Sequence, residues 1–166
     1  MLRLLLLALA WGIAALPAAA QDVLPVPALS ARVIDQTGTL EPAQREQLEA
    51  RLAAFEQSKG TQIVVLLVPS TQPEDIAAYA QRVADSWKIG RRDIGDGLLI
   101  VVAKNDRRVR IEVAKTLEGA VPDLAARQII DRQIAPAFKS GDFAGGLEAG
   151  VAALIARIDS EGLPQP

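Results

Sequence analysis

Acidic side chains stand at both ends of the segment from Asp96 to Asp123, which reads DGLLIVVAKNDRRVRIEVAKTLEGAVPD. The residues between them indicate two strands joined by a tight turn, so the acids lie where the chain enters and leaves a sheet. Open α/β sheets usually hold their binding sites outside the strand ends. The first candidate chemistry is therefore that of carboxylates.

The chain contains no histidine and no cysteine, which limits that chemistry further. A Ser-His-Asp or Cys-His catalytic set, a phosphohistidine and an ordinary zinc site are all excluded. Any reaction must use carboxylates, hydroxyls, lysine or arginine. A bound metal would need oxygen ligands, which favours calcium, magnesium or manganese.

Two strands of different character must position the acids. The six residues from Leu98 to Ala103 are all apolar, which is typical of a strand covered on both faces. Asn105-Asp106 predicts a tight turn. From Arg108 to Val113 charged and apolar residues alternate, which predicts a partner strand with one face in water.

The other elements follow from apolar spacing and from capping residues. We expect a short strand at 32–35, a helix from Pro42 to Gly60, and a buried strand at 61–68. A capping box at Thr71–Glu74 predicts the start of a second helix, which ends at Gly90. Asp123 is expected to cap a third helix that ends near Pro136, and a fourth helix is expected after Asp142. This order predicts a single α/β domain, a three-layer αβα sandwich around a small mixed sheet of about four strands.

The first twenty residues read as a secretory signal peptide, with a basic start at Arg3, an apolar run from Leu4 to Leu16, and Ala18-Ala19-Ala20 before the cleavage point. An uncleaved N-terminal anchor is the alternative, although the run is short for a membrane span. We therefore expect an exported, periplasmic chain without a transmembrane span after cleavage. Its expected divisions are a signal peptide at 1–20, an extended lead-in at 21–31, one domain at 32–158 and a frayed tail at 159–166.

Charge argues against nucleic acid as a partner. The net charge is −2, and it becomes −3 once Arg3 leaves with the signal peptide. Arg91-Arg92 and Arg107-Arg108-Arg110 are too small to form a phosphate-binding surface on their own.

One short motif points to an alternative chemistry. The run from Asp35 to Leu40, DQTGTL, is similar to the phosphorylated-aspartate motif of P-type ATPases and haloacid-dehalogenase-type phosphatases. That motif needs a long buried strand before the aspartate, and here proline residues precede a run of four residues. The favoured interpretation is a turn before the first helix.

Several motifs, in their order and spacing, resemble the TPM domain family over about residues 29–158. The residues that carry the resemblance are Asp35, Trp87-Lys88-Ile89-Gly90, Asp96-Gly97, Val109-Arg110-Ile111-Glu112-Val113, Leu117-Glu118-Gly119, Pro122-Asp123, Pro136-Ala137-Phe138 and Gly141-Asp142-Phe143. The resemblance implies an αβα sandwich with a shallow acidic site that binds calcium or related cations in some members. It also implies a link to membrane protein complexes, and a modest acid phosphatase activity attributed to plant relatives.

The resemblance implies that four residues of this chain are candidate metal ligands: Asp35, Asp96, Glu118 and Asp123. Carboxylates that converge repel one another, and calcium or magnesium would relieve that repulsion. The alternative is that Asp35 and Asp123 cap a turn and a helix and that Glu118 is solvated. The family commonly has Gly-Tyr-Gly where this chain has Ala114-Lys115-Thr116, so Lys115 brings a positive charge to the site as a charge partner or an anion contact.

Three functions remain open from the sequence. The first is an exported accessory or interaction domain that contacts membrane or envelope protein complexes through an acidic, divalent-cation-binding loop face. The second is a weak metal-assisted phosphatase acting on phosphomonoesters, with Asp96 and Glu118 holding the ion. The third is a structural domain whose acids serve as caps.

Overall fold

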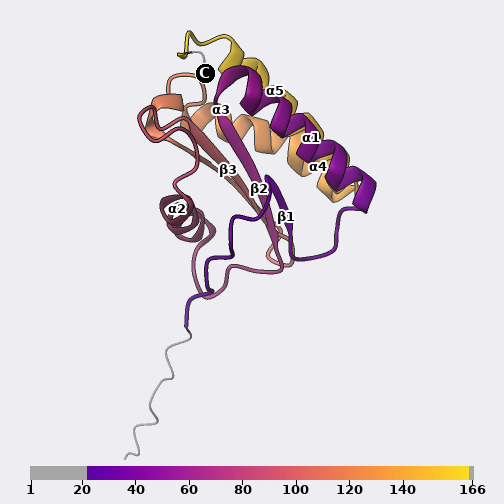
Figure 1. The fold of residues 1–166 in the computed structure, drawn as a ribbon. Helices are drawn as coiled ribbons and strands as arrows, with labels where there is room; N and C mark the ends of the chain where they lie inside the picture. Colours follow the sequence, from indigo (N-terminus) through magenta and orange to yellow (C-terminus); the bar gives the residue numbers. More distant parts are fainter. Residues whose placement is uncertain (1–21, 165–166) are drawn as a thin grey trace, which may run out of the picture.

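The computed structural model describes residues 22–164 and contains one α/β domain (Figure 1). The predicted signal peptide lies outside the described residues, as do the last two residues of the expected tail. The strands are β1 (Val33–Asp35), β2 (Gln62–Val68), β3 (Gly97–Ala103) and β4 (Arg108–Val113). The helices are α1 (Pro42–Lys59), α2 (Ile76–Trp87), α3 (Asp123–Ile129), α4 (Ala135–Lys139) and α5 (Phe143–Asp159), with a 3₁₀ turn at Lys115–Leu117 and a π-helical segment at Ile130–Ile134.

The four strands form one mixed sheet in the order β1-β2-β3-β4. The first three are parallel, and β4 returns antiparallel beside β3 through the expected turn. The sheet is covered on both faces, which confirms the predicted three-layer arrangement (Figure 1). Apart from Gln62 at the start of β2, the residues of its central strands are apolar and buried, because neither face of the sheet meets water.

The two faces of the sheet carry different layers. Alternate residues of β2 and β3, such as Val65 and Ile100, pack against α1, α3 and α5. The intervening residues, such as Leu66 and Val101, pack against α2 and the lead-in. The lead-in is tied to α2, because the Arg82 guanidinium donates to the Leu24 carbonyl oxygen at 2.7 Å and the Trp87 indole donates to that of Pro27 at 2.7 Å.

This layering has a topological consequence. The chain steps from β1 to β2 and from β2 to β3 in the same direction, and all three strands are parallel. The first step crosses over through α1 on one face and the second through α2 on the other. The two crossovers therefore have opposite hands, although nearly all parallel crossovers are right-handed.

Three expected boundaries differ in the structure. The second helix begins at Ile76 with Asp75 as its N-cap, not within Thr71–Glu74. The third does not close near Pro136, because a π-helical segment precedes α4 and the helical path continues to Lys139. Asp123 is the first residue of α3 and not its N-cap. The N-cap is Pro122, and no side-chain hydrogen bond caps this helix.

The tail is docked as far as it is described. Lys59 and Asp159 form an ion pair at 3.2 Å, and the Leu163 side chain packs against the larger core. Asp159 and Leu163 thus contact the folded domain, in the part of the chain that the sequence predicts to be a frayed tail. None of the helices within residues 22–164 has the length and apolar character needed to cross a membrane.

Candidate functional site

Asp96 is the buried acid of the site, with a side chain that is 0% exposed. Its Oδ1 accepts a hydrogen bond from the Arg91 backbone N–H at 2.8 Å. Its Oδ2 accepts from the Arg91 guanidinium at 2.6 and 2.8 Å and from the Thr61 hydroxyl at 3.4 Å. Both carboxylate oxygens are thus bound to groups of the protein, and the negative charge is neutralised by Arg91.

Arg91 is itself fixed by several contacts. Its guanidinium also donates to the carbonyl oxygens of Lys59 at 3.3 Å and Pro164 at 2.9 Å. Gly60, which ends α1 at φ +79°, leaves the guanidinium its space, because a Cβ at that position would collide with it. One side chain therefore joins the end of α1, the loop before β3 and the tail.

Asp35 lies at the opposite end of the sheet from Asp96. It is the last residue of β1 and pairs with Leu67 near the end of β2, whereas Asp96 precedes the start of β3. Since these strands are parallel, an acid at the carboxyl end of one strand and an acid before the start of another lie at opposite ends of the sheet. The expectation that Asp35 joins Asp96 in one site is therefore wrong.

Asp35 instead stabilises the turn before α1. Its carboxylate accepts from the Thr37 N–H at 2.8 Å, the Thr37 hydroxyl at 2.6 Å and the Leu40 N–H at 2.8 Å. Partial burial alone would raise its pKa, but these hydrogen bonds together hold the pKa below its usual value. This is the turn interpretation of the DQTGTL motif.

The remaining predicted residues follow β4, at the same end of the sheet as Asp96. Lys115, Glu118 and Asp123 are all exposed. The loop that carries them is tied to the loop before β3, because the Thr116 hydroxyl donates to the Ile94 carbonyl oxygen. Within residues 22–164, Lys115 forms no ion pair with Glu118 or Asp96.

These positions do not fit a shared calcium or magnesium site. Among residues 22–164, no three acidic side chains are grouped closely enough to hold a metal ion. A cation at Asp96 would have to displace the Arg91 guanidinium from a buried carboxylate. In the same part of the chain, every buried side-chain nitrogen and oxygen already has a hydrogen-bond partner, so none is left waiting for a ligand.

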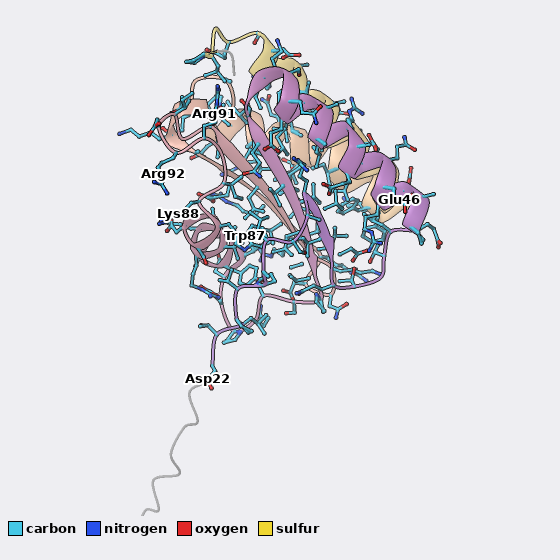
Figure 2. All side chains as sticks on the ribbon, viewed as in Figure 1. Asp22, Glu46, Trp87, Lys88, Arg91 and Arg92 are labelled. Atoms are coloured by element: carbon cyan, nitrogen blue, oxygen red, sulfur yellow. The ribbon has the colours of Figure 1, made fainter. Side chains whose placement is uncertain are left out.

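The structure joins two loops into one surface, which we call the loop rim: residues 91–96 and 114–119. Exposed charges of both signs project from it, from Arg92, Asp93, Lys115 and Glu118. Figure 2 shows Arg91 and Arg92 at this end of the sheet, far from Glu46 on α1. Beside the rim, a cavity of about 340 Å³ lies between α2 and the end of β4, with Lys88 and Lys115 among its lining residues.

Arg91 is the residue that the sequence interpretation missed. It lies five positions before Asp96 in a loop, where neither helical nor strand spacing would connect the two. A signal was nevertheless present. An acid directly before a fully apolar strand is expected to be buried, and a buried acid needs a basic partner nearby.

Comparison with known proteins agrees with this fold. A family model, the TPM domain, matches residues 33–157. The N-terminal domain of a protein from P. gingivalis is similar at 35% identity, with a TM-score of 0.70 and with 78% of this chain and 82% of that chain covered. No curated protein matches the chain significantly.

Two further solved structures share the fold at lower identity. The BA42 protein from Bizionia argentinensis has a TM-score of 0.64 at 23% identity, covering 73% of this chain and 82% of its own. The N-terminal domain of cg2496 protein from Corynebacterium glutamicum has a TM-score of 0.60 at 18% identity, covering 84% and 88%. With the family model spanning most of the described residues, the chain belongs to the TPM domain family.

Proposed function

We propose that this TPM domain is an exported binding module that contacts a protein partner of the cell envelope through the loop rim, with neither a bound metal ion nor catalysis. The observation that carries the proposal is the pairing of Asp96 with Arg91, which commits the buried acid of the rim to an internal contact. Export rests on the signal-like residues 1–20.

The construction of the rim supports a binding role. Its two loops are fixed to each other through Thr116 and Ile94, and to the tail through Arg91 and Pro164. Loops held on a rigid scaffold are the usual place for recognition, because little conformational entropy is lost when they bind. The exposed charges of both signs would give such a contact its selectivity and its salt dependence.

Site-specific photo-crosslinking in the native host tests this proposal. A photoreactive amino acid is placed at Arg92 or Lys115 in the rim, and at Glu46 on α1 as the matched exposed control. We expect a discrete adduct from both rim positions and none from Glu46, and we expect Lys115→Glu to weaken the adduct formed at Arg92. Equal labelling from all three positions, or none from the rim, would contradict the proposal.

Two solution measurements separate this function from its alternatives. Calorimetric titration with calcium, magnesium and manganese should give no heat and no rise in melting temperature. Hydrolysis of a phenyl phosphate ester should be equal in the native protein and in Asp96→Asn. Tight binding of a divalent ion, or a rate that Asp96→Asn abolishes, would favour the metal-assisted phosphatase instead.

A further inference from the structure

A second cavity lies at the end of the sheet opposite the loop rim. It has a volume of about 670 Å³ and lies between the β3–β4 turn and the corner where α4 is followed by α5. This is about twice the volume of the cavity beside the rim. Its size falls within the range of ordinary small-molecule sites, roughly 300–1,000 Å³.

One wall of the cavity is apolar and partly aromatic. Phe138 of α4 and Phe143 of α5 lie with their ring centroids 4.7 Å apart and their planes tilted by 39°. Val109 of β4 faces the same side, because it alternates with Arg108 and Arg110 and packs against the larger core. These half-buried groups offer apolar area that a ligand could remove from water.

Positive side chains surround this apolar wall. The Lys104 ammonium lies 5.3 Å from the centroid of the Phe143 ring, and Arg107 and Lys139 also line the cavity. Within residues 22–164, none of these three forms an ion pair with an acid. Arg108 borders the cavity too, but the strand alternation directs it to the face covered by α2.

The acids nearest in sequence are committed elsewhere. The Asp106 carboxylate accepts from the Ser70 hydroxyl at 2.7 and 2.9 Å and from the Thr71 N–H at 2.9 Å. The Asp142 carboxylate caps α5 by accepting from the Gly145 N–H at 2.8 Å. No acidic residue lines the cavity among the described residues. Asp106 and Asp142 keep their negative charges nearby, but the lining itself carries only positive charges, which favours an anion in the cavity.

We infer that this cavity binds a small anionic amphiphile, a carboxylate or phosphate joined to an apolar body about the size of a medium-length acyl chain. The apolar body would lie against Phe138, Phe143 and Val109, and the anionic group would contact Lys104, Arg107 and Lys139. Both halves are needed, because the apolar wall gives the burial and the free cations give the charge pairing. A hollow of this size fits a free molecule, in contrast to a membrane surface, which an exposed convex patch would fit better.

Titration of the purified protein with three probes tests the two halves separately. Decanoate carries both the tail and the charge, decanol the tail alone, and acetate the charge alone. We expect decanoate to shift the backbone amide signals of Val109, Lys139 and Phe143, with an affinity at least about tenfold above that of either other probe. Its affinity should fall as salt is added, because the cationic side chains are partly exposed.

Paired charge reversals locate the site. Lys104→Glu with Lys139→Glu changes two charges at the cavity, and Lys88→Glu with Lys115→Glu makes the same change at the other end of the sheet. The first pair should weaken decanoate binding by at least about tenfold, and the control pair by less than about twofold. Melting temperatures of both variants confirm that each remains folded.

Three outcomes would overturn the inference. They are the absence of amide shifts with decanoate up to about 1 mM, equal weakening by both charge-reversal pairs, and equal affinity for decanoate and decanol. Co-sedimentation with vesicles of an anionic phospholipid distinguishes the source of the ligand. Binding to vesicles that Lys104→Glu with Lys139→Glu removes, without binding of free decanoate, would assign the surface to a membrane and contradict a free ligand.

Discussion

At the scale of single residues, the contact between Arg91 and Asp96 determines how the predicted site is built. A carboxylate that is 0% exposed has no access to water and depends on its partner for neutralisation. Because the Arg91 side chain is itself 23% exposed, the pair is not fully buried and the loss of one member is moderated by solvent. The hydrogen bonds between Asp96 and Arg91 fix the conformation of the loop rim.

Replacing Arg91 should nevertheless destabilise the folded protein. Arg91→Met leaves the Asp96 carboxylate buried without its counter-charge, and we expect the free energy of unfolding to fall by about 2–4 kcal/mol. Adding Asp96→Asn should restore part of the loss, so that the double variant is less destabilised than the sum of the two single variants. Urea unfolding measures this cycle, with Arg92→Met as the exposed control. A loss below about 0.5 kcal/mol in Arg91→Met would contradict a structural role.

The turn at Asp35 should make stability depend on pH. Its folded-state pKa lies below the unfolded value, so its contribution is fully present above the unfolded pKa and is lost as pH falls through the folded pKa. Asp35→Asn should therefore destabilise the protein by about 1–2 kcal/mol at neutral pH, and the difference should shrink below about pH 4. Denaturant unfolding across pH measures this, with the exposed Asp131→Asn as control. A difference that is constant with pH would contradict the assignment.

At the scale of elements, the opposite hands of the two crossovers explain why each face of the sheet has its own layer. If both crossovers had the same hand, α1 and α2 would lie on one face, since the steps run in one direction. The arrangement leaves α2 alone with the lead-in on one side and groups α1, α3 and α5 on the other (Figure 1). The lead-in is thus part of that layer, covering apolar area that a single helix leaves open.

The β3–β4 turn contains a residue in an unfavourable conformation. Arg107 has φ +53°, the left-handed region that costs a residue with a side chain about 1 kcal/mol relative to glycine. We expect Arg107→Gly to leave the free energy of unfolding unchanged or raise it by up to about 1 kcal/mol. If the cavity binds an anion, the same change should weaken decanoate binding. Thermal unfolding together with the titration measures both, and clear destabilisation would contradict the relief of strain.

At the scale of the whole molecule, strands and layers could be predicted from the sequence because the spacing of apolar residues follows directly from which positions are buried. The helix boundaries could be predicted less accurately. The Thr71 N–H is bound by Asp106 from the distant hairpin and the Thr71 hydroxyl donates to the Glu74 carbonyl oxygen, so the residues expected to cap α2 form a turn instead. The π-helical segment at Ile130–Ile134 likewise could not be predicted from the spacing of apolar residues.

The site was predicted less well than the fold, for a reason that topology supplies. Acids at strand ends were expected to lie close together. In parallel strands, however, the last residue of one strand and the residue before another lie at opposite ends of the sheet. Asp35 and Asp96 are such a pair. Glu118 and Lys115 lie at the same end of the sheet as Asp96. The partner of Asp96, Arg91, comes from the loop before β3, and the spacing of apolar residues does not predict the path of that loop.

The docked tail offers a test at this largest scale. Leu163 packs against the larger core, and we expect Leu163→Ala to lower the free energy of unfolding by about 1 kcal/mol, because its side chain is partly buried. Glu161→Ala, at an exposed neighbouring position, is the control. Equal unfolding midpoints for native protein and Leu163→Ala would show that the tail adds nothing to stability.

The two ends of the described chain also define an orientation. Pro164 is held against Arg91 at the rim, whereas Asp22 lies well away from Arg91 and Arg92 (Figure 2). A bead or sensor chip linked through the amino terminus would hold the molecule with Arg92 and Lys115 directed outward. A linkage through the carboxyl terminus would bring the solid support against those same side chains, so the choice of tag decides whether a partner of the rim can be captured.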